Sequence, residues 1–225
     1  MSGRVSVISK SVLVTVLSVP ILSIAQEKAI EPDLMRLVEG KGWKISNRAV
    51  AAVEESGKKG IRFDERLGGG VAWLEGTKFA NGVIECDIKG KDVFQNSFVG
   101  LAFRGVDEKT QDVVYCRPFN FRAADPERRS HAVQYVSHPT YTWSKLRNEH
   151  PAVYEKPVDP APDPNGWFHL RIVVSKPKVS VYINDAKEPS LVVQELSERM
   201  DGWVGLWVGN TSGGTFANLK ITPGR

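Results

Sequence analysis

The sequence predicts an all-β fold: a single-domain antiparallel β-sandwich of jelly-roll type. Apolar and polar residues alternate with a period of two in some eleven or twelve short runs, which is typical of half-buried strands. Turn residues separate these runs, and the chain holds 20 glycines and 13 prolines among its 225 residues. One short helix is predicted near residues 33–38, where Asp33 is a candidate N-cap. Many short strands with almost no helix favour a sandwich.

The predicted strands follow one another along the chain, with turn residues between most of them. Two weaker candidates come first, and the full set comprises residues 49–53, 60–63, 71–74, 83–88, 98–104, 113–117, 132–137, 167–174, 179–184, 191–193, 203–208 and 215–221. The turns lie at Asn81-Gly82, Gly90, Asn184-Asp185, Asp201-Gly202 and residues 210–214, because Gly, Asn and Asp adopt the backbone angles of tight turns. Hydrophobic residues make up 41% of the chain, enough to bury a core.

The N-terminal residues 1–25 are predicted to be a signal peptide. Arg4 and Lys10 give it a positive start, residues 11–25 carry no charge, and Ser23 and Ala25 fit the −3 and −1 positions of a cleavage site. A membrane anchor is the alternative, but 15 residues that include a proline are too few for the roughly 20 that span a bilayer. We therefore expect export to the periplasm or the extracellular space, with residues 26–42 as a lead-in and 43–225 as the sandwich.

The charge balance favours a neutral ligand over nucleic acid. The whole chain carries a formal net charge of +4, and removal of residues 1–25 takes away two positive charges and no acid. The remaining surface is nearly neutral, which suits a hydrogen-bonding ligand such as a sugar. No second long apolar run follows, so we expect no membrane span in the mature chain. Cys86 and Cys116 are interpreted as two buried small hydrophobes, with a disulfide as the alternative.

Two segments interrupt the strand pattern. Residues 118–130 form a connection rich in Arg, Phe and Asn, and residues 138–166 form a longer one with six prolines. Connections as long as the second one, beyond about 15 residues, are usually functional or disordered. The second segment carries Tyr141, Trp143 and Tyr154, a composition that argues against disorder. We therefore predict that residues 141–154 form an ordered lid or rim over the sheet.

The polar positions of the predicted strands suggest a binding face. If these faces coincide in one sheet, a concave surface presents Glu85, Asp87, Arg104, Tyr115, Arg117 and Gln134, with Asn120, His138, Trp143 and Arg147 added from the loops. Planar polar groups and aromatic rings together are the mix that binds hydroxyl-rich sugars. The alternative is a solvated sheet face with cross-strand salt bridges. The four histidines form no HExxH motif, and we expect no metal site and no cofactor.

Several stretches resemble the concanavalin A-like lectin and glucanase jelly roll. They are residues 81–90, 98–105, 113–121, 165–174, 179–185 and 202–221, and together the resemblance covers about residues 40–222. The sequence is most similar to bacterial secreted 3-keto-disaccharide hydrolase domains, which are loosely related to family-sixteen glycoside hydrolases. The resemblance implies a jelly roll that acts on glycosides or 3-keto-glycosides. Laminin G-like modules share this sandwich without any enzymatic role.

One departure from the glucanase pattern leaves the activity open. Glucanases carry Glu-x-Asp-x-Glu on the catalytic strand, whereas this chain continues from Glu85 and Asp87 to Lys89 and Gly90, so the third carboxylate is absent. In a hydrolase, Glu85 and Asp87 would act as acid and base or position the ligand. Arg104, Arg117 and Gln134 would hold sugar oxygens, and Trp143 would stack on a ring. A non-catalytic carbohydrate-binding module and a laminin G-like interaction module remain as the other hypotheses.

Overall fold

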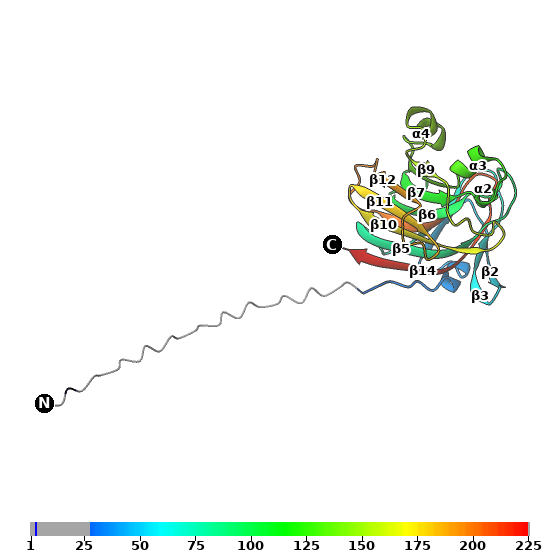
Figure 1. The fold of residues 1–225 in the computed structure, drawn as a ribbon. Coiled ribbons are helices and arrows are strands. Elements are labelled where there is room, and N and C mark those ends of the chain that lie inside the picture. Colours follow the sequence, from blue (N-terminus) through cyan, green and yellow to red (C-terminus); the bar gives the residue numbers. More distant parts are fainter. Residues whose placement is uncertain (1–2, 4–27, 225) are drawn as a thin grey trace.

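A computed structural model describes Gly3 and residues 28–224 of the chain, and it is a two-sheet sandwich (Figure 1). The predicted signal peptide, Gly3 apart, lies outside the described residues. Both sheets have seven strands, and every strand pair is antiparallel. The all-β prediction is confirmed. No helix among the described residues is long and apolar enough to cross a membrane.

One sheet, which we call the pocket sheet, carries the hollow described below. Its strands lie in the order β1 (Trp43–Ser46), β4 (Gly70–Leu74), β13 (Trp203–Val208), β6 (Val99–Gly105), β7 (Gln111–Cys116), β8 (Val133–His138) and β9 (Glu155–Lys156). The short strands β1 and β9 lie outside the predicted runs and form the two edges.

The other sheet, the back sheet, packs against the inner face of the first. Its order is β12 (Leu191–Gln194), β11 (Lys178–Ile183), β10 (Trp167–Ser175), β5 (Asn81–Lys89), β14 (Gly214–Gly224), β3 (Lys58–Phe63) and β2 (Val50–Glu55). Neighbours in both sheets come from distant parts of the chain, as β14 beside β5 shows. Sheet membership is therefore set by long-range pairing.

The core lies between the two sheets and follows the period of two. Ile84, Cys86 and Ile88 of β5 point inward, and Val99 and Leu101 of β6 face them from the pocket sheet. Both cysteines are buried and free, as the interpretation as small hydrophobes predicted, and burial raises the pKa of each thiol. At the N-terminal end, Ile30 pairs with Ile221 of β14, and Leu37 is buried, so this lead-in packs on the sandwich.

Short helices occupy the two long connections. The predicted helix is α1 (Met35–Val38), and three more are α2 (Pro118–Phe121), α3 (Pro126–Ser130) and α4 (Trp143–Glu149). Asp125 caps α3 by accepting a hydrogen bond from the Glu127 backbone N–H, and Thr142 caps α4 in the same way through Lys145. Figure 1 shows α2, α3 and α4 on one side of the molecule, away from α1, β2 and β3.

Candidate functional site

The outer face of the pocket sheet carries a hollow of about 1050 Å³. Six of the predicted site residues line it: Tyr115, Arg117, Asn120, His138, Trp143 and Arg147. Five of them lie on β7, α2, β8 and α4, and Arg117 is the residue between β7 and α2. The helices α2 and α4 of the two long connections supply half of this set. A hollow of this size, with aromatic and polar groups converging on it, is the usual form of a ligand site.

One row of directly opposed residues crosses the floor of the hollow. It runs through Val71, Trp207, Gly100, Tyr115, Gln134 and Glu155, one from each of six adjacent strands. Opposed residues in an antiparallel ladder share a face. Because Gly100 has no side chain, the rings of Trp207 and Tyr115 meet above it with their centroids 5.2 Å apart. Trp207 is 8% exposed and belongs to the buried core cluster, and it also lines the hollow.

Arg117 is held rigidly beside this row. Its Nη2 donates to the Tyr115 hydroxyl at 2.8 Å and to Gln134 Oε1, and its Nη1 donates to the His131 carbonyl at 2.8 Å. Tyr115 in turn donates to Gln134 Oε1 at 2.6 Å. Desolvation by burial raises the pKa of Tyr115, which keeps its hydroxyl protonated. The alternation of side chains along each predicted strand thus gave the correct common face for Tyr115, Arg117 and Gln134.

A buried carboxylate, Glu155 of β9, connects helix α4 to the floor of the hollow. Arg147 of α4 donates to both of its oxygens at 2.7 Å, and Arg117 lies 3.5 Å from Oε2. His131 Nδ1 lies 2.9 Å from Oε1 without hydrogen-bond alignment. The hydrogen bond with Glu155 raises the pKa of Arg147. Glu155 therefore neutralises part of the positive charge that the arginines bring to the hollow.

Two polar residues at the β7–β8 edge complete the lining. Gln111 of β7 pairs directly with His138 of β8, and both face the hollow. Burial lowers the pKa of His138, so its imidazole is neutral at pH 7. Gln111 Oε1 is buried and has no hydrogen-bond partner among the described residues. An acceptor left open in this way is available to a ligand hydroxyl.

Glu85 and Asp87 do not belong to this site, and the expectation of one shared surface is wrong. Both lie on β5, in the back sheet, with their side chains on its outer face. There Asp87 accepts hydrogen bonds from Lys58 at 2.6 Å and from Asn218 at 2.7 Å, and its other oxygen lies 2.8 Å from His169 Nδ1. The alternation along the sequence gave the correct, outer face of the strand. The strand itself, however, belongs to the back sheet and not to the pocket sheet.

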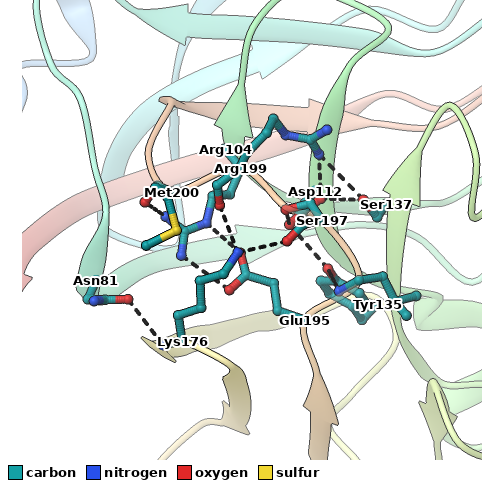
Figure 2. Close-up of polar contacts among 11 residues, drawn as sticks. Asn81, Arg104, Asp112, Tyr135, Ser137, Lys176, Glu195, Ser197, Arg199 and Met200 are labelled. Carbon is teal, nitrogen blue, oxygen red and sulfur yellow. Dashed lines mark hydrogen bonds and ion pairs between the residues drawn. The ribbon is translucent and has the colours of Figure 1, made fainter.

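Arg104 is also absent from the hollow, because β6 contains a bulge. Phe103 and Arg104 together oppose the single residue Val204 of β13, and Arg104 has a φ of 53°. The extra residue turns the Arg104 side chain inward, since a bulge breaks the alternation of faces. Figure 2 shows its guanidinium bonded to Glu195 and to the Met200 carbonyl, next to the cluster around Asp112.

The segment 141–154 forms a rim, mostly as helix α4. Trp143 and Arg147 line the hollow, and the Arg147 guanidinium lies 5.2 Å from the Trp143 ring centroid. Tyr141 instead packs against the core. Trp143 is 51% exposed, so about half of its surface is left open to a ligand. Trp143 and Arg147 therefore form the rim that this segment was predicted to supply, and Tyr141 does not line the hollow.

Gln111, Arg128, His131 and Glu155 are among the lining or supporting residues that were not predicted. Gln111 lies an even number of residues from Tyr115 on the same strand, so its side chain could have been assigned to the same face from the sequence. The other three lie in the connections or on a two-residue edge strand, where no sequence period reports which way a side chain points.

Comparisons with known proteins agree with this architecture. The carbohydrate-binding module CBM66 from Bacillus subtilis is 19% identical over 80% of this chain and 96% of its own, with a TM-score of 0.57. A protein of unknown function with a galectin-like fold, also from Bacillus subtilis, is 12% identical over 80% of this chain and 88% of its own (TM-score 0.53). The lumenal domain of VIP36 in its Ca²⁺- and mannose-bound form is 11% identical over 80% and 82% of the two chains (TM-score 0.52). These likenesses show the fold.

A search of curated proteins found no match. A family model does match: the 3-keto-alpha-glucoside-1,2-lyase-like domain covers residues 35–222, which is most of the chain. The family resemblance inferred from the sequence is thereby confirmed, together with a carbohydrate-related function. The chain belongs to the family of 3-keto-alpha-glucoside-1,2-lyase-like domains.

Proposed function

We propose that the hollow of the pocket sheet binds a carbohydrate. The observation that carries this proposal is the floor itself, where the Trp207 and Tyr115 rings lie beside fixed polar groups from Arg117 and Asn120. Aromatic faces pack on the apolar face of a sugar ring, while the polar groups hydrogen-bond to its hydroxyls. A preformed floor of this kind also lowers the cost of ordering the site on binding.

Two-carboxylate glycoside hydrolysis is not supported by the lining. Glu108 is the one carboxylate among the described residues that line the hollow, and Glu155 beneath it is already engaged by two arginines. Retaining hydrolysis requires two carboxyl groups about 5–5.5 Å apart. Binding without hydrolysis is therefore the leading function, and an elimination that needs one base is the second candidate.

His138 is the observation that favours the elimination. It faces the hollow, and its lowered pKa leaves a neutral imidazole that accepts a proton at pH 7. In a 3-keto-glycoside the carbonyl at C3 acidifies the proton on C2. His138 takes that proton, the C2–H electron pair forms a C1–C2 double bond, and the bond from C1 to the glycosidic oxygen breaks. The departing oxygen takes a proton from water.

The test combines binding with product detection. The purified protein is titrated calorimetrically with neutral and acidic oligosaccharides, and it is incubated with a 3-keto-disaccharide while the absorbance of the unsaturated ketone is followed. Elimination predicts product from the wild type and a loss of at least tenfold in rate in H138A. H150A is the matched control, because His150 packs on Tyr154 outside the hollow. Binding without product would support carbohydrate binding and contradict the elimination. Absence of binding would refute the proposal.

Export is proposed on the residues that predict a signal peptide. N-terminal sequencing of protein recovered from the native host should begin at Gln26 or close to it. An intact Met1 on protein from the cytosolic fraction would contradict export.

A further inference from the structure

We infer that the carbohydrate taken by the hollow carries an anionic group, a carboxylate or a sulfate, and that Arg128 receives it. This inference rests on the proposed carbohydrate binding and narrows its ligand class. It departs from the neutral ligand that the overall charge balance favours, because the charge that matters is local to the hollow.

Basic side chains outnumber acidic ones around the hollow. The lining holds four of them, Lys109, Arg117, Arg128 and Arg147, against Glu108 alone. Glu155, just beneath, is shared between Arg117 and Arg147. Counting Glu155, the hollow keeps a net charge of about +2 from these residues. A net positive charge within a partly desolvated hollow attracts anions more strongly than the same charge on an open surface.

Arg128 on α3 and Lys109 are the two lining cations that form no ion pair among the described residues, and of the two only Arg128 is half-buried. Arg128 Nη2 donates to the Phe119 carbonyl at 2.8 Å, and its Nε donates to Asn120 Oδ1 at 3.3 Å. The guanidinium lies over the Phe94 ring, 4.5 Å from its centroid. Among residues 28–224 it forms no ion pair, and its Nη1 donates no hydrogen bond.

The nearest acidic residue in sequence, Glu127, is directed elsewhere. Its carboxylate lies 3.0 Å from His131 Nε2, and its side chain is 79% exposed. Arg128 is therefore oriented by two neutral oxygens and an aromatic face, and its charge is left available. An arginine fixed in one orientation presents a planar fork that matches carboxylate and sulfate oxygens. A neutral sugar would leave this charge uncompensated when it displaced water from the hollow.

The experiment compares three probes of equal length: a galacturonic acid trisaccharide, a sulfated trisaccharide and a neutral galactose trisaccharide. Calorimetric titration of the full protein should give at least tenfold tighter binding for one of the anionic probes than for the neutral one. The anionic probe that binds more tightly shows whether the site prefers a carboxylate or a sulfate. Raising the salt from 50 to 500 mM should weaken the anionic complex several-fold and leave the neutral one nearly unchanged, because salt screens charge.

The variant R128Q should lose the preference for the anionic probe by about tenfold. R129Q is the matched control, since Arg129 lies on the same helix but donates only to the Ala123 and Ala124 carbonyls, outside the hollow. If R128Q does not fold, the salt dependence of the wild type decides the question. Equal affinity for all three probes overturns this inference but leaves carbohydrate binding in place. Failure of all three probes to bind overturns both.

Discussion

Gly100 occupies a position in the pocket floor where a side chain cannot be accommodated. A Cβ atom built there would lie 2.1 Å from the Val114 carbonyl oxygen and 2.5 Å from Tyr115 Cα. Both are backbone atoms of the neighbouring strand, so they cannot move aside without distorting the ladder. The close approach of the Trp207 and Tyr115 rings thus depends on this glycine.

We predict that G100A lowers the free energy of unfolding by about 1–3 kcal/mol, the usual cost of overpacking. Chemical denaturation followed by tryptophan fluorescence measures the change. G69A is the control, because a Cβ at Gly69 meets only the Val208 carbonyl at 3.5 Å, an ordinary contact. Equal stability of G100A and wild type would show that β7 shifts freely and that the floor is not fixed by this residue.

At the scale of secondary-structure elements, helix α4 forms the rim of the hollow. Arg147 anchors the helix through two hydrogen bonds to the Glu155 carboxylate of β9. Trp143 of the same helix has half of its surface exposed. A ring exposed to this degree contributes little to folding, but it offers area for a sugar to cover.

We therefore predict that W143A weakens carbohydrate binding by about 1–3 kcal/mol, through loss of stacking and burial. The melting temperature should change little. W143F should retain part of the affinity, and V153A, which alters an exposed residue outside the hollow, should retain all of it. Unchanged affinity of W143A with a large fall in melting temperature would mean that the ring is structural.

The outer face of the back sheet holds a second polar group, in which His169 of β10 bridges to β5. The hydrogen bond with Asp87 raises the pKa of His169, despite partial burial, and Glu85 lies 3.6 Å from its other nitrogen. Desolvation opposes ionisation of Asp87, but hydrogen bonds from His169, Lys58 and Asn218 prevail and lower the pKa of Asp87. The carboxylate therefore stays ionised wherever His169 titrates.

Because the folded pKa of His169 is raised, its contribution to stability is fully present below about pH 6.5, its unfolded value. The contribution is lost as pH rises through the folded pKa. We expect the stability difference between wild type and H169Q to shrink from pH 6 to pH 9, measured by urea denaturation. A difference that is constant with pH would refute the ion pair.

At the scale of the whole molecule, residues 195–202 join the two sheets at one end of the sandwich. Arg104 of the pocket sheet pairs with Glu195, which follows β12 of the back sheet, and both side chains are fully buried. Beside them the buried Asp112 accepts hydrogen bonds from Ser137, Ser197 and Arg199 (Figure 2). Burial raises the pKa of Asp112, although these donors oppose the shift.

Breaking the buried Arg104–Glu195 pair should be costly. We predict that E195Q lowers the free energy of unfolding by about 3–5 kcal/mol, because Arg104 is then left as an uncompensated buried charge. The double variant R104M/E195L removes both charges and should lose less than E195Q alone. Denaturation of R104M, E195L and the double variant completes the cycle. Additive losses would show that the two side chains are not coupled.

The sequence by itself determined the class of fold and the face on which most strand residues lie. Alternation in each predicted run has a local cause, the pleat of a single strand, so the runs overlap observed strands and Tyr115, Arg117 and Gln134 share one face as predicted. The same alternation placed both cysteines in the core, and the structure shows that they are not bonded to each other.

Only the tertiary structure decided which faces meet. Strands pair with neighbours far away in the chain, so no local pattern could assign Glu85 and Asp87 to the back sheet. A single inserted residue turned Arg104 into the core, because a bulge reverses the parity beyond it. Arg128 and Glu155 lie in segments whose sequence shows no alternation of apolar and polar residues, so their place in the site could not be predicted. Long-range hydrogen bonding, rather than local alternation, therefore set the composition of the site.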